Sequence, residues 1–515
     1  MPRTVFLIIC TILCNLGLAN GQVIPSQLGE CTTAIFSGAV TIDGRPIIWK
    51  NRDVSNPDQR YIYYDSYQRD GINTYRFIGD CYRADTTKIY QGTNERGFAI
   101  MNSDSYNLRD SLYSGLDDGT IMRLALETCV TLSDFEGLLD STNAVGRMDC
   151  WNFGCLDSTG SCAFYESANR SYRKYDPLDQ ALNAPGFIVR SNFSFSGDSL
   201  YQSGLDRYGR AVELIAGRLD SGQLDVNWVL AVLARDMASI FANPYPLPYH
   251  GSHLNGPPGY IYNFACTIAN RFTTSVVAIR GVQPGEDPAL TTTFAILGQP
   301  ALSLAYPLWV KTGMVPTYLD DPTGAPMYTY CRDRSSLLYD NTAAYYFLNS
   351  LYLVNDDGSG VYSYTLPLEA WGIGEVSRLF ESWLVESPTV DDMRLEQSRI
   401  ATTLFTGFKD ETARYLGDSS GIILPNTSTL FNYPNPFNSG TYIVYYGTQS
   451  NYPVRVRIFD INGRLVSELE GTGGAVGDVY WTGRDTFGRA VSSGVYFYIL
   501  DNGPFKSTNK MLLLK

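Results

Sequence analysis

The stretch that decides the fold begins at residues 30–36, ECTTAIF, and continues through residues 43–53, DGRPIIWKNRD. A cysteine opens one apolar run, an Asp-Gly-Arg-Pro turn follows, and a second apolar run ends in a cluster of charges. Two apolar runs joined by such a turn predict a β-hairpin. The hairpin would bring the thiol of Cys31 at one strand end close to the charged residues at the other.

The composition limits the class of protein. A chain of 515 residues predicts two or three domains, and 44% hydrophobic residues can supply a large core. The net charge of −13 argues against nucleic acid and anionic membrane surfaces as partners. Neither a Gly-rich phosphate loop nor a zinc-protease helix motif is present, so no cofactor is expected.

The first residues resemble an export signal in their pattern. Arg3 precedes an apolar run that extends to about Leu18, and small residues follow up to Gly21. This predicts a secretory signal over 1–21, because the run is too short to span a bilayer. An exported protein meets conditions that favour disulfides, and Cys150, Cys155 and Cys162 are close enough in sequence for a bridge.

Helical and strand patterns follow one another in runs along the main part of the chain. Helical spacing of apolar residues predicts helices over 119–139 (interrupted near Ser133), 205–219, 226–238, 369–385 and 390–416. A hairpin is expected over 150–166. Runs of strands and of helices, rather than strict alternation, favour an α+β sandwich of antiparallel sheets over a doubly wound fold.

The character of the chain changes after Gly417. Residues 432–438, NYPNPFN, form a rigid polar junction, and short strand patterns alternate beyond it with turns at 460–463 and 484–488. This predicts a small all-β sandwich. The expected division is a signal at 1–21, a candidate propeptide at 22–30, a main domain at 31–425, a linker at 426–438 and a C-terminal domain at 439–515.

Histidine is scarce, and this restricts the chemistry. The only two histidines, His250 and His253, lie in a loop rich in Pro and Gly, which disfavours Cys-His or Ser-His-Asp catalysis. A nucleophile that is the first residue of the mature chain can instead use its own α-amino group as base. Cys31 meets this condition if the bond after Glu30 is cut. The alternative is an ordinary disulfide or buried cysteine.

The opening hairpin resembles that of the cysteine N-terminal-nucleophile (Ntn) hydrolases. The similar groups are the choloylglycine hydrolase and penicillin V acylase family, the isopenicillin-N acyltransferase-like family and the Cys-type dipeptidases. The resemblance rests on Cys31 and on residues 50–53, KNRD. It implies that Asp53 positions the amine of the nucleophile. Lys50 occupies the position at which these families have an arginine that would bind substrate. The lysine keeps a positive charge there, but it lacks the guanidinium group that can form two parallel hydrogen bonds to a carboxylate.

Two further motifs resemble the same families and imply amide groups near the nucleophile. Residues 94–102, NERGFAIMN, resemble a strand that ends in an oxyanion-hole asparagine, here Asn102. Residues 189–193, VRSNF, resemble an element that makes Asn192 a second amide near the site. A β-turn with a capping asparagine is the alternative for Asn102.

A third motif, residues 203–207 (SGLDR), resembles a helix start behind the site and implies Arg207 as a site residue. A surface ion pair is its alternative. Together the resemblance implies an αββα sandwich in which the Cys31 thiolate attacks an amide carbonyl. The α-amine would relay the proton, the two asparagines would stabilise the oxyanion, and water would resolve the acyl-enzyme.

The tail carries a separate resemblance. The segments YPNPFN, FDINGR, SGVYFY and KMLLLK, which begin at residues 433, 459, 493 and 510, resemble the C-terminal sorting domains of type IX secretion cargo. Those domains are related to the Ig-like domain of the flagellar hook-cap protein. The resemblance implies a bacterial source, passage through the outer membrane, and release or surface attachment. A carbohydrate-binding or adhesive Ig-like module is the alternative.

These observations predict a secreted amidohydrolase or acylase that cleaves a linear, non-peptide C–N bond of a small N-acyl compound. The alternatives are an acyltransferase-like enzyme, a Cys-type dipeptidase, or a non-catalytic surface or adhesive protein of the same fold. The expected partners are the substrate and, through the C-terminal domain, the type IX secretion machinery. No nucleic acid is expected as a partner, and no transmembrane segment after signal removal.

Overall fold

A computed structural model describes most of the chain. The described residues are 30–108, 114–179, 185–239, 243–251, 258–263, 265–339, 347–415, 430–433, 437, 440–446, 452–471, 476–503 and 505–514. The expected signal, all of the candidate propeptide except Glu30, and most of the expected linker lie outside them.

Sheet I contains the opening hairpin. Its six strands are antiparallel in the order β12-β1-β2-β14-β15-β16. The hairpin is confirmed, because Ala34 of one strand pairs with Trp49 of the other. The strands are β1 (Thr32–Phe36), β2 (Ile47–Asp53), β12 (Phe187–Arg190), β14 (Thr273–Arg280), β15 (Thr292–Leu297) and β16 (Tyr306–Leu308).

Sheet II is formed by the intervening part of the chain. Its order is β11-β10-β9-β8-β7-β6-β3, again antiparallel throughout. The hairpin expected over 150–166 is confirmed as β9 and β10. The strands are β3 (Gln59–Tyr64), β6 (Phe77–Tyr82), β7 (Gln91–Asn94), β8 (Ala99–Asp104), β9 (Trp151–Leu156), β10 (Cys162–Ser167) and β11 (Tyr172–Tyr175). Two small ribbons accompany the sheets, β4 (Gln68–Arg69) with β5 (Ile72–Asn73) and β13 (Tyr260–Tyr262) with β17 (Phe347–Asn349).

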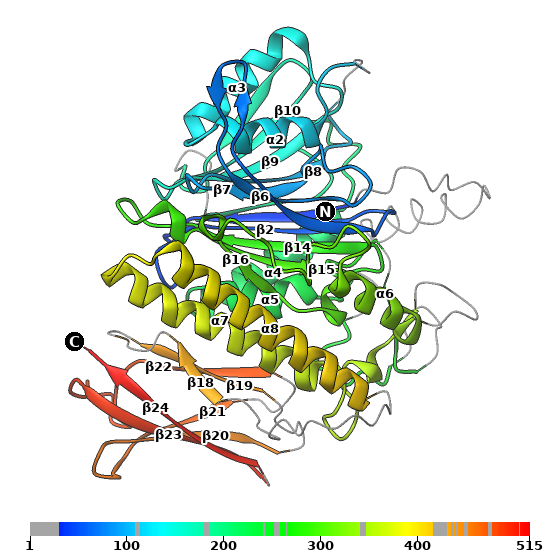
Figure 1. Ribbon diagram of the computed structural model, residues 1–515. Helices are drawn as coiled ribbons and strands as arrows, with labels where there is room; N and C mark the ends of the chain where they lie inside the picture. The colour runs from blue at the N-terminus through cyan, green and yellow to red at the C-terminus, as the bar shows by residue number, and fades with distance from the viewer. Residues whose placement is uncertain are drawn as a thin grey trace.

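The two sheets are stacked face to face with helices on both outer faces (Figure 1). Helices α2 (Asp118–Thr128) and α3 (Leu132–Val145) cover sheet II. Sheet I is covered by α4 (Leu205–Ser221), α5 (Val226–Ala231), α7 (Tyr362–Val385) and α8 (Val390–Tyr415), with α6 (Pro326–Leu338) beside β15. The layers therefore follow the expected αββα order of an antiparallel α+β protein.

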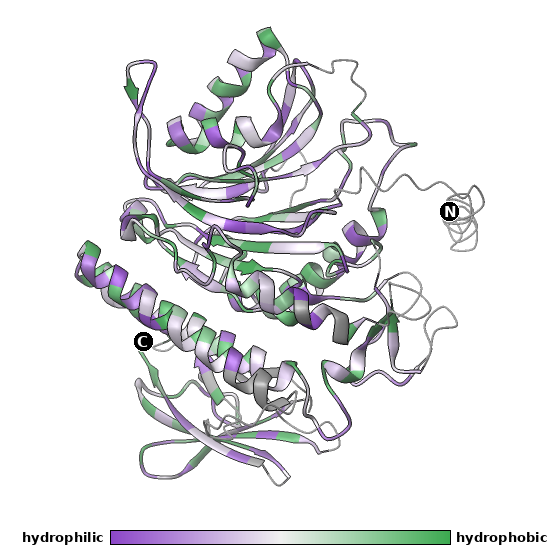
Figure 2. Cartoon of the chain, turned by 45° about the vertical axis from the view of Figure 1, so that its right-hand side comes forward, coloured by the Kyte–Doolittle hydropathy of each residue, from purple (hydrophilic) through white to green (hydrophobic). Residues whose placement is uncertain are grey.

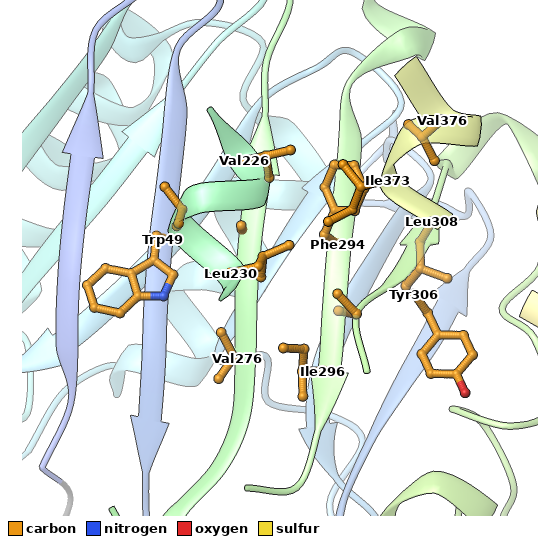
Figure 3. Packing of buried hydrophobic residues seen from close by; sticks show 14 of the residues in the cluster. Trp49, Val226, Leu230, Val276, Phe294, Ile296, Tyr306, Leu308, Ile373 and Val376 are labelled. Carbon is orange, nitrogen blue, oxygen red and sulfur yellow. The ribbon is translucent and has the colours of Figure 1, made fainter. Parts of the chain in front are cut away.

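Strand alternation divides the side chains of sheet I between two cores. Ile35 and Ile48 belong to the core between the sheets, whereas Trp49 belongs to the core between sheet I and its helices. Figure 3 shows Trp49 with Leu230 of α5 and Val276 of β14 in this second core. Burial on both faces explains why β1 and β2 are buried at every position.

The helices depart from the sequence expectations at three places. The stretch 119–139 is two helices, because Thr131 and Asp134 form a capping box that begins α3. The helix expected over 226–238 ends at Ala231. A 3₁₀ turn follows in which Arg235 turns inward and donates to Leu230 O and to Glu369 of α7, at 2.7 Å in each case.

The third departure concerns the first of the two long helices. Helix α7 begins at Tyr362, not at residue 369, and encloses Pro367, which local propensity treats as a helix boundary. Figure 2 shows hydrophilic and hydrophobic residues alternating along α7 and α8, as expected for helices that pack one face on a sheet. Among the described helices, none is long and apolar enough to cross a membrane.

The prediction of a disulfide within the cluster of Cys150, Cys155 and Cys162 is wrong for Cys155 and Cys162. Cys162 pairs in register with Leu156, and Cys155 pairs with Ala163. Cys155 lies in the core against α2 and α3, whereas Cys162 lies in the core between the sheets. The two thiols therefore point to opposite faces of sheet II. Six of the cysteines carry free thiols: Cys31, Cys81, Cys129, Cys155, Cys162 and Cys331.

The C-terminal part forms two antiparallel sheets with a hydrophobic core of their own. The strands pair as β18-β19-β22 and β21-β20-β23-β24, and β19 contacts α7. They lie on the far side of α7 and α8 from the sheets of the main domain (Figure 1). Their bounds are β18 (Leu430–Tyr433), β19 (Thr441–Tyr446), β20 (Val454–Phe459), β21 (Leu465–Gly471), β22 (Val476–Trp481), β23 (Gly494–Asn502) and β24 (Phe505–Leu513).

Candidate functional site

Cys31 stands at the head of β1 on the face between the two sheets. The alternation that places Ile35 in the inter-sheet core places Cys31 on the same face, and that of Ile48 does the same for Lys50 and Arg52. Cys31 is 6% exposed. Burial raises the pKa of its thiol, and Lys50 is the charge that most opposes this rise.

Lys50 forms a buried chain of contacts across the two sheets. Its Nζ donates to Asn102 Oδ1 at 2.7 Å and to the Tyr90 carbonyl at 3.0 Å. Asn102 Nδ2 in turn donates to Asp118 Oδ2 at 2.8 Å. The predicted oxyanion residue is thus near Lys50, and Asp118 engages one of the two N–H donors of its amide. The second N–H is the donor that could bind an oxyanion.

Asp53 is held on the opposite, helix-facing side of β2. Asn270 Nδ2 donates to its Oδ2 and Thr273 Oγ1 donates to its Oδ1, each at 2.6 Å. A bulge in β14 between Thr273 and Ser275 makes this approach possible. Burial, partly offset by Arg207, raises the pKa of Asp53 to about 7. The backbone carbonyl of Asp53 also accepts from Glu30 N at 3.0 Å, which extends the β1–β2 ladder to Glu30.

Arg207, in the first turn of α4, joins the remaining predicted residues. Its Nη1 donates to the Cys31 carbonyl at 2.7 Å and to Thr32 Oγ1 at 3.0 Å. Its Nη2 donates to Asn192 Oδ1 at 2.9 Å and forms an ion pair with Glu30 Oε2 at 3.4 Å. Arg207 is completely buried, so the alternative of a surface ion pair is wrong.

The structure thus brings together all six residues singled out in the sequence, five from sheet I and the helix start beside it and one, Asn102, from β8 of sheet II. Cys31 and Lys50 lie toward sheet II, whereas Asp53 and Arg207 lie toward the helices. Asn192, two residues after the end of β12, connects Arg207 to sheet II, because its Oδ1 accepts from Arg207 and its Nδ2 donates to the carbonyl of Asp104 at 3.3 Å.

Asp104 is a site residue that sequence reasoning missed. It ends β8, and its charge acts on the Cys31 thiol, raising the pKa of that thiol. Burial, reinforced by the charge of Asp118, raises the pKa of Asp104 itself to about 7. Its position two residues after Asn102, hence on the same face of the strand, was the signal that could have identified it.

Arg52 belongs to the motif KNRD at residues 50–53, but the sequence did not indicate a function for it. Its guanidinium lies over the rings of Tyr90 and Tyr82, 4.0 and 4.8 Å from their centroids. Nearby, Asp80 accepts from Ser275 Oγ at 2.7 Å, and burial raises the pKa of Asp80 to about 6. Tyr82 ends β6 of sheet II and Tyr90 directly precedes β7, so no pattern local to β2 could have indicated this contact.

The histidine loop does not contribute to this site. His250 pairs with Asp356 at 2.8 Å on the surface, and His253 lies outside the described residues. Within the part of the chain that the structure describes, no group of His, Cys, Asp and Glu side chains is arranged to hold a metal ion.

The comparison with protein families matches the first half of the main domain. Residues 40–201 match the family model described as acyl-coenzyme A:6-aminopenicillanic acid acyl-transferase. The matched segment contains Lys50, Asp53, Asn102 and Asn192 and ends just before Arg207. It supports, at the level of the superfamily, the resemblance to Ntn enzymes of the acyltransferase and acylase type.

Several solved structures are similar to parts of the chain. A mutant of conjugated bile acid hydrolase from Clostridium perfringens has 11% identity over 54% of this chain and 92% of its own, with a TM-score of 0.34. Penicillin V acylase from Agrobacterium tumefaciens has 12% identity over 54% and 86%, with a TM-score of 0.28.

PorZ, a bacterial surface component of the type IX secretion system of Porphyromonas gingivalis, has 26% identity over 17% of this chain, with a TM-score of 0.14. The chain covers 11% of PorZ and 10% of PorU from the same organism. The TM-scores of all these structures are below 0.5. No curated protein matches the chain.

Proposed function

We propose that the chain is an amide hydrolase of the Ntn type whose nucleophile is Cys31. The observation that carries this proposal is the setting of Cys31 at the head of β1. Lys50 lies beside its thiol, and Arg207 holds its carbonyl at 2.7 Å. In the described structure the nitrogen of Cys31 is still part of the peptide bond to Glu30. Cutting that bond would create the α-amine that serves as base.

The mature mechanism then follows from the side chains around Cys31. The α-amine takes the thiol proton, and the thiolate attacks the carbonyl carbon of the substrate amide. Lys50 stabilises the thiolate, and Asn192 and Asn102 are the candidate donors to the oxyanion. The proton passes to the leaving amine, and water hydrolyses the thioester. Asp53, buried behind β2, would hold the α-amine in place.

The proposed substrate is a small N-acyl compound with a linear, non-peptide C–N bond. Residues 40–201 support this class through their match to an acyl-transferase family, and the same match keeps transfer to a second amine as an alternative to hydrolysis. Assays with acyl-amides, dipeptides and an added acceptor amine distinguish hydrolase, dipeptidase and acyltransferase.

We further propose that residues 439–515 direct export by type IX secretion. The proposal is supported by the four sequence segments noted above and by a separate hydrophobic core, to which Leu430 and Phe437 of the expected linker also belong. The signal at 1–21, the propeptide at 22–30, and a secreted or cell-surface location in a bacterium belong to the same proposal.

Replacing the nucleophile tests the proposal. Cys31→Ala should lower amide hydrolysis by at least about a thousandfold and leave the chain uncut after Glu30, because it removes the thiol that attacks both bonds. The measurements are turnover of acyl-amides and the intact mass of the protein.

The matched control is Cys129→Ala, which removes another buried thiol from the core against α2 and α3. It should keep both activity and cleavage. Undiminished amidase activity in Cys31→Ala, or a natural chain that starts before Cys31, would overturn the proposal.

A further inference from the structure

The peptide bond between Glu30 and Cys31 is held from both sides by one arginine. Arg207 donates to the carbonyl of Cys31 at 2.7 Å, on the amine side of the bond. The same guanidinium pairs with the carboxylate of Glu30 at 3.4 Å, on the acyl side. A third contact, from Glu30 N to Asp53 O at 3.0 Å, keeps Glu30 in the β1–β2 ladder.

The side chain of Glu30 lies on the face of sheet I opposite to the thiol. Strand alternation places Glu30 with Thr32, toward α4, and places Cys31 toward sheet II. The Glu30 carboxylate therefore does not compete with the thiol for space. It anchors the residue whose carbonyl carbon the thiol must reach.

We propose that Glu30 is a positioning residue for self-cleavage, orienting the scissile bond through its ion pair with Arg207 and then leaving with the propeptide. This inference rests on the proposed function of Cys31. It goes beyond that function because it assigns a task to a residue that the mature enzyme no longer contains.

Self-cleavage requires no reactant other than water. Cys31 Sγ forms a bond to the Glu30 carbonyl carbon, the C–N bond breaks, and the thiol proton ends on the new α-amine of Cys31. Water then hydrolyses the thioester, which restores the thiol and leaves Glu30 with a terminal carboxylate. Both sides of the broken bond must be held during the attack, because small misplacements of reacting atoms slow such reactions strongly.

Departure of Glu30 leaves Arg207 with its other partners. The contacts to the Cys31 carbonyl, Thr32 Oγ1 and Asn192 Oδ1 do not involve the propeptide. The geometry of the mature site therefore does not depend on the identity of residue 30. A change at Glu30 should affect maturation and nothing after it.

The test follows self-cleavage of the full-length chain after cell-free synthesis, by intact mass. Glu30→Gln keeps the size of the side chain and removes its charge, and should slow cleavage by roughly tenfold. Once cleaved, its product starts at Cys31 and should show the same kcat/KM as the natural mature enzyme, because the two are chemically identical.

The matched control is Glu213→Gln, on the same helix as Arg207. Glu213 is exposed and pairs with Arg210 at 3.0 Å, so this variant makes the same change in charge away from the scissile bond. It should be cleaved at the natural rate. Equal cleavage rates for the natural chain and Glu30→Gln would overturn the inference and leave the role of Cys31 intact. A natural chain that is not cleaved at all would overturn the proposed function instead.

The rate of self-cleavage as a function of pH provides a second test, because a purely structural role of Glu30 would not change this dependence. Burial raises the pKa of Glu30, against the opposing effect of Arg207, and Asp206 adds to the rise. Asp53 and Tyr106 also face Glu30, whose charge raises the pKa of both groups. As pH falls, protonation of Glu30 should remove the ion pair, so the natural chain should slow toward the rate of Glu30→Gln. A ratio of the two rates that is constant with pH would contradict the inference.

Discussion

The thiol of Cys31 lies between charges of opposite sign, Lys50 and Asp104. The lysine lowers the pKa of the thiol and the aspartate raises it, while burial raises it most of all. Neither side chain is on the strand that carries Cys31. The charges that act on the nucleophile therefore come from β2 of sheet I and β8 of sheet II.

Replacing the two charges should move the pKa of the Cys31 thiol in opposite directions. Lys50→Met removes the cation that stabilises the thiolate and should raise this pKa, whereas Asp104→Asn removes an anion and should lower it. The measurement is the rate of alkylation of Cys31 as a function of pH. Shifts of the same sign in both variants would show that altered packing, rather than charge, governs the thiol.

Part of the site could be predicted at the residue scale. Cys31, Lys50 and Asp53 follow from one short stretch, because a hairpin brings its two strand ends together wherever it lies in the fold. Asp104 escaped prediction because its importance comes from its position across the sheet interface. Asn270 escaped as well, since its contact with Asp53 depends on a bulge in β14.

At the scale of elements, the start of α4 is the feature on which the site depends. Gly204 precedes the helix with a φ of +73°, and a Cβ added there would lie 2.5 Å from Arg207 Nη2. Arg210, one turn further, fixes the helix through two bonds to Asp236 at 3.0 and 2.9 Å. The helix thus presents Arg207 to Cys31 in one orientation.

Adding a methyl group at this helix start should displace the arginine. Gly204→Ala is expected to destabilise the fold by about 1–2 kcal/mol, through its left-handed backbone, and to lower self-cleavage and activity by more than about tenfold. The measurements are urea unfolding and cleavage followed by intact mass.

Gly217→Ala, on the same helix, is the control, because nothing lies within 4 Å of the Cβ it would add. It should be neutral or stabilise by up to about 1 kcal/mol. Full cleavage of Gly204→Ala at the natural rate would contradict the role given to the helix start.

The elements that were predicted correctly are those whose sequence pattern lies within one short stretch and agrees with the contacts they make in the folded protein. The β1–β2 and β9–β10 hairpins carry both strands and turn in one stretch, and the long α8 shows its apolar face over many turns. The end of α5 could not be predicted. The ion pair of Arg235 with Glu369, a residue more than a hundred positions away in sequence, draws the chain out of the helix.

On the scale of the whole molecule, the candidate site and the C-terminal sheets belong to different cores. Every singled-out site residue lies between Cys31 and Arg207, while the C-terminal core contains only residues from 430 to 513. The two parts approach each other at α7 and β19. Among the described residues, the buried clusters of the two parts have no member in common.

Removing residues 426–515 should therefore separate export from catalysis. We expect the shortened chain to hydrolyse acyl-amides within about twofold of the natural rate, because the site lies wholly within the main domain. The same deletion should abolish export from the natural host. The measurements are kcat/KM of the purified chain and its distribution between cells and medium. Loss of activity without loss of folding would show that the C-terminal part contributes to the site.

The sequence by itself determined the opening hairpin, the antiparallel α+β class and the order of the main elements. These properties depend on contacts between neighbouring residues and on the period of apolar positions, both of which are visible in one dimension. It also placed Cys31 beside Lys50 and Asp53, since hairpin register is a local property.

Only the tertiary structure decided which charges surround the thiol and how Arg207 holds the peptide bond to Glu30. These contacts join α4, β8 and β14 to a hairpin far away in sequence. Their distances follow from how the two sheets stack and where β14 bulges. Packing of that kind is settled by the whole core at once, and no local pattern of residues contains it.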